Sequence, residues 1–355
     1  MAKVFLVDLE AVETRYTGQW KTHVPKLLEE NGHDVTVISG PTDIPSATTP
    51  GAFLNFGGTN VYKARQVETI GRLFCDGRVS PGDHFLFTDA WHPGIINLKY
   101  MSELLGIPVK IHALWHAGSY DPQDFLGRLI GDALWVRHAE KSFFYAVDHN
   151  YFATEFHIDI FEKNLLGLDA GYDQIKPNHV VRTGWPMEYM VEMLEPYKNL
   201  QKRNLILFPH RIASEKQVEI FRDLAESMPE YEWVVCQDQQ LTKDQYHTLL
   251  GQSKIVFSAN LQETLGISCY EGALVNAIPM VPDRLSYVEM YADIWRYPED
   301  WTESFESYLK HKDLLVAKIR EFMTDYDEYR KLVPQQASSL TKWFFSATNL
   351  LANVR

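Results

Sequence analysis

Short apolar runs alternate with helix-forming stretches along most of this 355-residue chain. Each run is rich in Val, Ile, Leu and Phe and is bounded by polar residues, Gly or Pro, which is typical of a buried strand. In the first half we predict strands at 3–9, 34–39, 84–88, 109–114, 146–151 and 180–182, and helices at 18–31, 62–74 and 95–105. In the second half we predict strands at 204–208, 233–236, 255–258 and 278–281, and helices at 215–228, 243–250 and 266–275. Strands separated by helices pair in parallel, so the pattern predicts an α/β protein with helices on both faces of its sheets.

The alternation occurs twice, and a chain of this length is too long for one ordinary core, so we expect two domains. We place the first at 1–185 and the second at 186–335, because Pro186, Pro196 and a polar stretch interrupt the pattern between them. Two further helices are predicted at 302–333 and 337–353. The last segment, 336–355, is expected to be a helix that crosses back to the first domain.

Composition narrows the class of protein. Hydrophobic residues make up 45% of the chain, which favours a folded globular protein. No apolar run approaches the roughly 20 residues that a membrane span needs, and the first residues lead into a strand without a signal-peptide pattern. The three cysteines, Cys75, Cys236 and Cys269, lie far apart, which predicts reduced thiols and a cytoplasmic protein. A net charge of −13 argues against non-specific binding to nucleic acid, although a local basic groove stays compatible with it.

Cofactor and metal motifs are absent from the sequence. There is no Gly-x-Gly-x-x-Gly or Gly-Lys-Ser/Thr loop, which argues against a dehydrogenase or an ATPase. None of the 13 histidines has ligand spacing with cysteine, and there is no His-Glu-x-x-His run. We therefore expect neither a bound cofactor nor a metal site.

The segment around Glu263 carries the strongest functional signal. An apolar strand at 255–257 leads through a polar loop to Gly266 and a helix-compatible run. A strand that feeds a helix N-terminus suits phosphate, because free N–H groups and the helix dipole point at the anion. Glu263 lies in the loop and Glu271 about two turns into the helix, so a diphosphate there would have a carboxylate on each side. One carboxylate suits the hydroxyls of a sugar and the other suits those of a ribose, as in a nucleotide sugar.

A basic pair follows a second strand of the same half. Arg211 and Lys216 fall in the loop and first helical turn after the strand at 204–208. Cations at this position would compensate the charge of a diphosphate and stabilise it as it departs. The pair alone favours surface residues at a helix start, but together with Glu263 and Glu271 it favours a diphosphate site.

These motifs resemble a known family. The Glu-x7-Glu spacing of Glu263 and Glu271, and the loop from His210 to Lys216, are similar to those of retaining GT-B glycosyltransferases, most closely glycosyltransferase family four, with His210 where glycine is usual. The resemblance implies two Rossmann-like domains that face each other across a cleft, a nucleotide-sugar donor as co-substrate, and metal-independent transfer with retention. It implies roles for the residues of the second domain as follows: Glu263 holds the transferred sugar, Glu271 the ribose, Arg211 and Lys216 the diphosphate, and Thr264, Gly266 and Ile267 contribute to donor binding.

The first domain carries the candidates for the acceptor side. Gly18 is the one glycine in a loop where the family often has two, and it would let a phosphate or acceptor approach the backbone. His116 follows the strand at 109–114, where the resemblance implies a histidine near the transferred sugar; it is also compatible with a loop residue beside Trp115. Asp89, Trp91 and His92 end another strand and are acceptor candidates, or else a capped loop before the next helix.

The leading hypothesis is therefore a retaining hexosyltransferase with a uridine diphosphate sugar as donor. One acceptor hypothesis is a hydroxylated base in DNA, because the segments 208–216 and 263–291 are similar to phage DNA glycosyltransferases; the location would then be the host cytoplasm. Cations at Lys63, Arg65, Arg72, Arg78, Arg128, Arg137 and Lys141 would contact the DNA phosphates. The alternatives are a saccharide or lipid-linked acceptor, and a non-catalytic module that binds nucleotide sugars.

Overall fold

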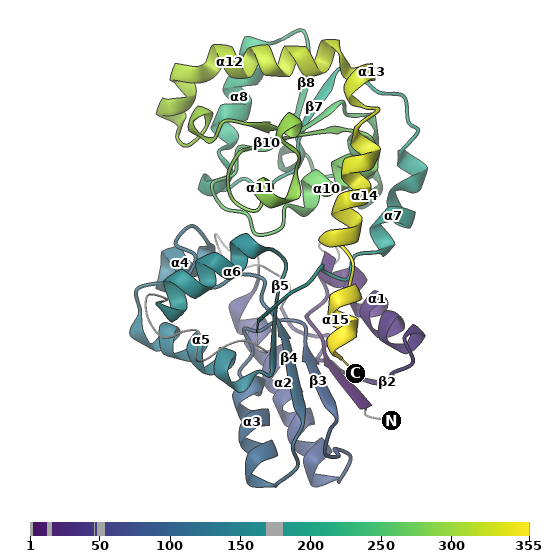
Figure 1. The fold of residues 1–355 in the computed structure, drawn as a ribbon, viewed down its shortest axis with the longest axis vertical. Coiled ribbons are helices and arrows are strands. Elements are labelled where there is room, and N and C mark those ends of the chain that lie inside the picture. The colour runs from purple at the N-terminus through teal and green to yellow at the C-terminus, as the bar shows by residue number, and fades with distance from the viewer. Residues whose placement is uncertain (1–2, 13–15, 46, 48–53, 168–179, 355) are drawn as a thin grey trace. The chain divides into compact units, whose positions relative to one another are not determined.

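The computed structural model describes residues 3–12, 16–45, 47, 54–167 and 180–354. The chain divides into two compact units, one formed by Met1–Pro186 with Ala347–Arg355 and the other by Met187–Ser346. Each unit contains one sheet of parallel strands surrounded by helices, so the predicted α/β class is confirmed (Figure 1). Among the described residues, no helix combines the length and the apolar character needed to cross a bilayer.

The first unit contains a six-stranded sheet in the order β2-β1-β3-β4-β5-β6. Its strands are β1 (Lys3–Val7), β2 (Asp34–Ile38), β3 (His84–Phe87), β4 (Lys110–Leu114), β5 (His149–Phe152) and β6 (Val180–Arg182). Its helices are α1 (Tyr16–Glu30), α2 (Phe56–Cys75), α3 (Gly94–Leu104), α4 (Phe125–Ile130), α5 (Leu134–Ala146), α6 (Glu155–Phe161) and α15 (Thr348–Asn353), with a π-helical turn η1 (Glu162–Leu166) after α6. The strand order reverses beside β1, which is where open α/β sheets bind ligands at the carboxyl edge.

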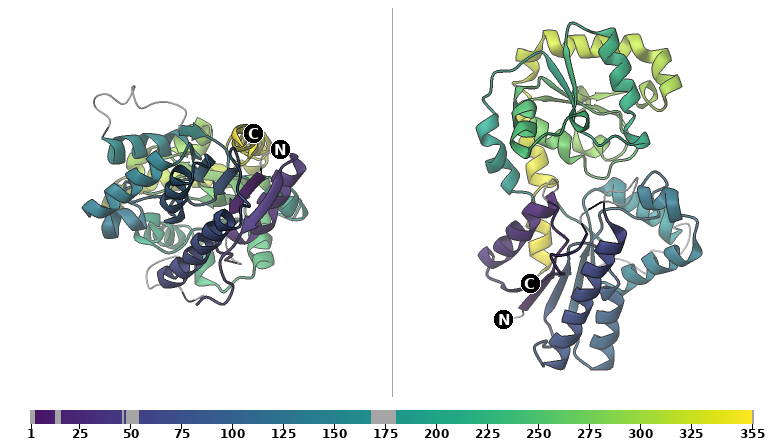
Figure 2. Two further views of the ribbon diagram at one scale, coloured as in Figure 1. Left: turned by 90° about the horizontal axis from the view of Figure 1, so that it is seen from below. Right: turned by 180° about the vertical axis from the view of Figure 1, so that it is seen from behind.

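The core of this unit lies between the sheet and the helices α2, α3 and α5. Apolar side chains of the strands, such as Phe85 and Phe87, meet Leu73, Leu98 and Phe144 of these helices, all of them almost completely buried. Figure 2 shows α1 and α15 side by side, apart from the α2–α3 pair. Burying both faces of the strands explains why they read as continuous apolar runs in the sequence.

The second unit contains a five-stranded sheet in the order β11-β10-β9-β7-β8. Its strands are β7 (Leu205–Phe208), β8 (Glu232–Val235), β9 (Ile255–Phe257), β10 (Ile278–Pro282) and β11 (Arg296–Tyr297). Its helices are α7 (Tyr189–Leu194), α8 (Val218–Ser227), α9 (Lys243–Gln252), α10 (Ile267–Leu274), α11 (Tyr287–Met290), α12 (Phe305–Thr324), α13 (Tyr326–Tyr329) and α14 (Val333–Trp343). Right-handed crossovers put α8 on one face and α9 and α10 on the other. Helix α12 packs beside α8, and α14 packs beside α10 (Figure 1).

The structure differs from the sequence prediction in several places. Helices α4, α5, α6, α7 and α11 were not predicted, and Ala146, expected at the start of a strand, ends α5 instead. The helix predicted at 302–333 is two helices, α12 and α13, because α12 ends at Thr324. The two-residue strand β11 was also missed. The helix predicted at 337–353 is two helices, because the backbone N–H groups of Phe344 and Phe345 both bond to the carbonyl of Leu340 and end α14. The Phe345 ring then stacks on Tyr270 of α10, with centroids 3.8 Å apart, and the chain resumes as α15.

Candidate functional site

Two loops at the carboxyl edge of the second sheet bring the predicted donor residues together. Strand β7 pairs directly with β9, so the segment after Phe208 and the segment after Phe257 leave the sheet side by side. The first segment carries Arg211 and Lys216, and the second carries Glu263. Parallel strands therefore place these three residues at one edge, where α/β sheets bind their ligands.

Lys216 and Glu263 form the centre of this site. The Lys216 ammonium lies 3.3 Å from a carboxylate oxygen of Glu263 and donates to the Gln262 carbonyl at 2.5 Å, and its side chain is almost buried. Burial opposes ionisation of Glu263, but the charge of Lys216, together with hydrogen bonds from Lys216 and the Gly266 backbone, outweighs it and holds the pKa of the carboxyl below its ordinary value. The site thus contains an ionised acid beside a cation.

The loop that carries Glu263 is tied down by two side chains. Gln217 adopts a left-handed backbone with φ of 53°, and its side-chain amide donates to the carbonyls of Ala259 and Thr302 at 2.7 and 2.6 Å. Arg284 donates to the Ala259 and Asn260 carbonyls, both at 2.8 Å, and also to Thr302. Since these bonds satisfy buried backbone carbonyls, the loop is fixed before any ligand binds.

Gly266 makes the turn from this loop into α10. It adopts a left-handed conformation with φ of 67° at the position just before the helix. A Cβ atom at Gly266 would lie 2.8 Å from the ring of Tyr287, whose hydroxyl bonds to Ser258 and Asn260. Only glycine meets both constraints, and the open helix N-terminus that follows, including the N–H of Ile267, suits an anion.

We predict that Gly266→Ala lowers the free energy of unfolding by about 1–3 kcal/mol. Alanine is strained in the left-handed backbone conformation, and its Cβ atom would clash with the Tyr287 ring. Urea unfolding monitored by circular dichroism measures this change. The matched control is Gly71→Ala, since Gly71 lies within α2 and has open space around it. The control should gain up to about 1 kcal/mol, and equal effects of the two changes would contradict the role given to Gly266.

Arg211 and His210 have different surroundings. Arg211 is about one-third exposed and forms an ion pair with the buried carboxylate of Glu215, four residues along. His210 is buried; its Nε2–H donates to the Phe257 carbonyl at 3.2 Å, and Nδ1 accepts from the Ser268 hydroxyl at 3.3 Å. Burial lowers the pKa of His210 to about 3, so the ring is neutral. His210 thus joins the β7 loop to α10 at a position where the resemblance implies glycine.

Glu271 lies on the next turns of α10. Its carboxylate accepts a hydrogen bond of 2.7 Å from the Tyr246 hydroxyl, and burial raises its pKa. The neighbouring Gly272 packs against β9, because a Cβ there would come within 2.6 Å of Val256. Close packing of α10 on the strand therefore fixes the position of Glu271. Thr264, which directly follows Glu263 in the loop before α10, is buried.

His116 of the first unit lies just after β4. Its Nε2–H donates to the Thr88 carbonyl and its Nδ1 accepts from the Tyr16 hydroxyl, both at 2.6 Å. The ring also packs against Trp185, with centroids 4.3 Å apart. Both ring nitrogens already have partners, so a contact from His116 to a sugar would replace one of these bonds. Gly18, predicted where the first loop meets the helix at 18–31, lies in the first turn of α1, which begins two residues earlier than expected.

Asp89, Trp91 and His92 follow β3, which pairs with β4. Asp89 forms an ion pair of 2.7 Å with Lys63 of α2. The Trp91 indole N–H donates to Glu140 of α5 at 2.9 Å. His92 is buried: its Nε2–H donates to Gln66 at 3.0 Å, and its Nδ1 accepts from the Gly94 backbone at 2.9 Å. Asp89 and Trp91 stay partly accessible, whereas the contacts of His92 are those of a residue that shapes the loop.

Sequence reasoning missed Gln217 and Arg284, which lie far in sequence from the carbonyls they hold. It predicted Lys63 only as a DNA contact and missed its ion pair with Asp89, 26 residues away. One signal was available for Gln217: a helix start at Val218 preceded by a residue without capping ability implies an unusual backbone. The site residues of the second unit come from adjoining strand ends, whereas those of the first unit belong to the separate sheet around β3 and β4.

Comparisons with known proteins bear on the fold. The sequence matches no protein-family model and no curated protein. In structure, the chain is similar to sucrose-phosphate synthase from Thermosynechococcus elongatus, with a TM-score of 0.64, 10% identity, and coverage of 99% of this chain and 97% of that one. It is similar to Anabaena HepE in complex with UDP and glucose, with a TM-score of 0.55, 11% identity, and coverage of 100% and 97%. It is also similar to an alpha-glucosyltransferase in complex with UDP and a 13-mer DNA, with a TM-score of 0.57, 12% identity, and coverage of 99% and 98%. These likenesses show that the chain has the GT-B fold.

Proposed function

We propose that this chain is a retaining glycosyltransferase that moves a hexose from a UDP-sugar to an acceptor hydroxyl. One observation carries the proposal: the ionised Glu263 lies against Lys216 at the carboxyl edge of the second sheet, just before the open N-terminus of α10. An acid for sugar hydroxyls, a cation for phosphate and a helix N-terminus for the same anion are what a nucleotide sugar requires. A GT-B fold over the whole chain supports this reading.

In the proposed reaction, the bond between the sugar's anomeric carbon and the diphosphate breaks as the acceptor oxygen bonds to the same face of that carbon. The electron pair of the broken bond stays on the diphosphate, and the departing phosphate oxygen takes the acceptor proton. Lys216, Arg211 and the N-terminus of α10 stabilise the charge that develops there. Glu263 accepts hydrogen bonds from the sugar, and Glu271, already bonded to Tyr246, accepts from the ribose. No step uses a metal or a cofactor.

For the acceptor we propose a hydroxylated base in DNA, and with it a cytoplasmic enzyme. The similarity in fold to the alpha-glucosyltransferase in complex with DNA supports this choice. Such a base would be turned out of the duplex, and phosphate contacts would hold the strand. The cations of α2 are partly compensated, because Arg65 and Arg72 pair with Glu68, and Lys63 pairs with Asp89. Lys141 of α5 is the stronger candidate for a phosphate contact.

The test is incubation of the protein with a panel of UDP-sugars and a duplex that contains hydroxymethylated cytosine, followed by mass spectrometry of the DNA. We expect a mass increase of one hexose residue on the hydroxymethylated duplex and none on the unmodified duplex. Digestion with an α-specific and a β-specific glucosidase reports whether the anomeric configuration is retained.

Other results would select an alternative. Hydrolysis of the donor without transfer to DNA favours a saccharide or lipid-linked acceptor. Binding of UDP without turnover of any UDP-sugar favours a non-catalytic nucleotide-sugar module. If UDP and the UDP-sugars fail to bind at millimolar concentration, the proposed function is wrong.

A further inference from the structure

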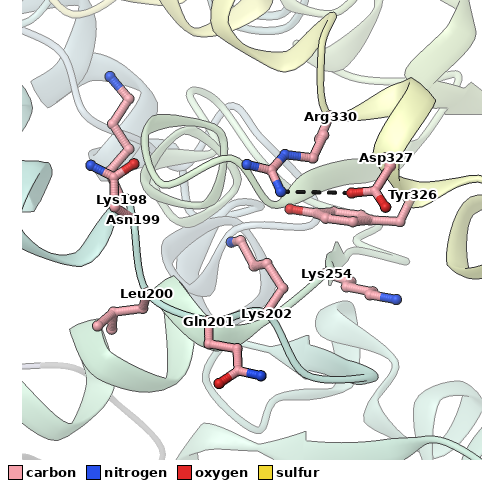
Figure 3. A pocket seen from close by; sticks show the side chains of 9 residues that line it. All are labelled: Lys198, Asn199, Leu200, Gln201, Lys202, Lys254, Tyr326, Asp327 and Arg330. Atoms are coloured by element: carbon pink, nitrogen blue, oxygen red, sulfur yellow. Dashed lines mark ion pairs between the residues drawn. The ribbon is translucent and has the colours of Figure 1, made fainter.

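A polar pocket lies at the edge of the second sheet that is opposite the candidate donor site. Its volume is about 450 Å³. Its walls are the segment before β7, Lys254 just before β9, and α13 with the turn that follows it (Figure 3). Because the strands are parallel, residues that precede them lie at the amino edge, whereas Lys216 and Glu263 lie beyond the carboxyl ends. Strands of three or four residues separate the two edges by roughly 10–13 Å.

Lys202 is the most buried of the positively charged residues that line this pocket. Its ammonium donates to the carbonyls of Ser253 and Val275, at 2.9 and 2.7 Å. Within the described residues, no carboxylate lies within ion-pair distance of Lys202. Burial, reinforced by the charge of Arg330, lowers the pKa of Lys202 to about 7. A positive charge at this position is therefore stabilised only by neutral backbone oxygens, and an anion in the pocket would supply the missing countercharge.

Lys254 and Arg330 lie on the two sides of the Tyr326 ring (Figure 3). Their charged groups are 5.3 and 5.8 Å from the ring centroid, within the range of cation–π contacts. The Tyr326 hydroxyl donates to the Asn276 carbonyl at 2.7 Å, so the ring is held in place. The Lys254 ammonium bonds to the neutral side chain of Asn204 and to no described carboxylate. The ring thus orders two cations without neutralising either.

The pocket carries more positive than negative charge. Arg330 has Asp327 at 3.7 Å, and Lys198, the fourth cation, has Glu195 at 3.5 Å. Lys202 and Lys254 have no such partner among the described residues. Two of the four cations are therefore uncompensated, in a chain whose overall charge is −13. All four line one polar pocket, which distinguishes this site from scattered surface lysines.

We propose that this pocket binds a small phosphate-bearing anion, at a site separate from the donor site. Lysine and arginine side chains that line one pocket suit a phosphate dianion, which accepts several charge-assisted hydrogen bonds. The bounded volume suits inorganic phosphate or a small phosphate ester rather than a nucleic-acid duplex, which needs a long basic track. The proposal does not rest on the glycosyltransferase function, because none of these residues belongs to the donor site.

The test is calorimetric titration of the whole protein with inorganic phosphate and, separately, with glycerol 3-phosphate at constant ionic strength. We expect Lys254→Gln and Lys202→Met each to weaken binding about tenfold, the effect of one charge-assisted contact. Lys331→Gln is the matched control: it removes a charge one residue from Arg330, but Lys331 is exposed, pairs with Glu328 and does not line the pocket. Lys331→Gln and the donor-site variant Arg211→Ala should both bind as the wild type does.

The two titrants identify the source of the phosphate. Tighter binding of glycerol 3-phosphate supports a phosphate ester as ligand, and tighter binding of inorganic phosphate supports the free ion. Binding that Arg211→Ala abolishes and the pocket variants retain would place the anion at the donor site and overturn the proposal. Absence of binding by either titrant at 10 mM, or binding of a 12-base-pair duplex alone, would also overturn it.

The pH dependence of anion binding distinguishes a Lys202 that contacts the anion from one that only supports the fold. Sulfate is the titrant, because its charge is constant between pH 6.0 and 8.5. The charged groups that face Lys202 are Lys198 and Lys254 from the segments before β7 and β9, and Asp327 and Arg330 from α13 and the turn after it. Sulfate should bind the wild type roughly tenfold more weakly at pH 8.5 than at pH 6.0, because at pH 8.5 the Lys202 amine is neutral and must take up a proton from solvent before it can pair with the anion. Lys202→Met should lack this dependence, and an equal dependence in both proteins would contradict the role of Lys202.

Discussion

Lys216→Met is expected to lower kcat for transfer or donor hydrolysis by a factor of about 100–1,000, the usual loss when a preorganised group at a developing charge is removed. Lys216 is nearly buried, and it lies where the departing diphosphate gains charge in the proposed reaction. Methionine keeps the length of the side chain, so the packing around it is largely preserved. Steady-state kinetics with a UDP-sugar measure the change, and kcat should fall by a larger factor than KM rises.

The matched control is Lys312→Met, because Lys312 of α12 also pairs with a carboxylate, that of Asp223. This pair lies away from the β7 and β9 loops, so the control should retain its turnover. Thermal unfolding of both variants shows whether the fold persists. A Lys216→Met protein that is folded and turns over at the wild-type rate would remove Lys216 from the proposed mechanism.

Acid is expected to destabilise the protein strongly before most carboxylates are protonated. Burial lowers the pKa of several histidines far below 6.5, so the native state holds them neutral while the unfolded chain protonates them. The unfolded state therefore binds more protons below pH 6.5, and stability falls as the pH falls. Between pH 7.5 and 5.5 each such histidine costs about 1.4 kcal/mol. The fully buried histidines of the first unit are His92, His112 and His157.

Together these three histidines predict a loss of about 4 kcal/mol, a large part of the 5–15 kcal/mol that is typical of a domain. Urea unfolding at pH 7.5 and 5.5 measures the loss. His92→Asn should reduce it by about one third, because asparagine does not titrate and can still accept from the Gly94 backbone. His138→Asn is the control, since His138 is exposed on α5. Equal stability at the two pH values would show that these rings are charged or hydrated in the native state.

Much of the fold could be predicted from sequence because its signals are local. The strands from Leu205 to Pro282 are short apolar runs, and each was predicted within one or two residues. Helix α5 was missed because Leu134, Trp135 and Tyr145 face solvent, so its apolar residues do not follow one stripe. The break between α14 and α15 depends on the stacking of Phe345 on Tyr270, a contact 75 residues apart that no window of sequence contains.

The candidate site residues likewise divide into those marked by a local sequence pattern and contacts that depend on distant segments. Glu263, Glu271 and Lys216 were candidates because their spacing after strands is a local pattern. The environments of Glu271 and His116 were not predictable, because they come from distant segments: Tyr246 for Glu271, and Tyr16 with Thr88 for His116. The ion pair of Asp89 with Lys63 likewise requires two segments that meet only in the folded chain.

The hydrogen bonds from Gln217 and Arg284 that hold the Glu263 loop affect how a mutant library for a different sugar should be designed. Gln217 and Arg284 both bond to the carbonyls of Ala259 and Thr302, so four separate segments of the chain share one set of hydrogen bonds. A mutant library that randomises the loop while keeping these two side chains retains its framework. A library that also varies Gln217 or Arg284 would contain mostly misplaced loops, and poor activity in it would say little about sugar choice.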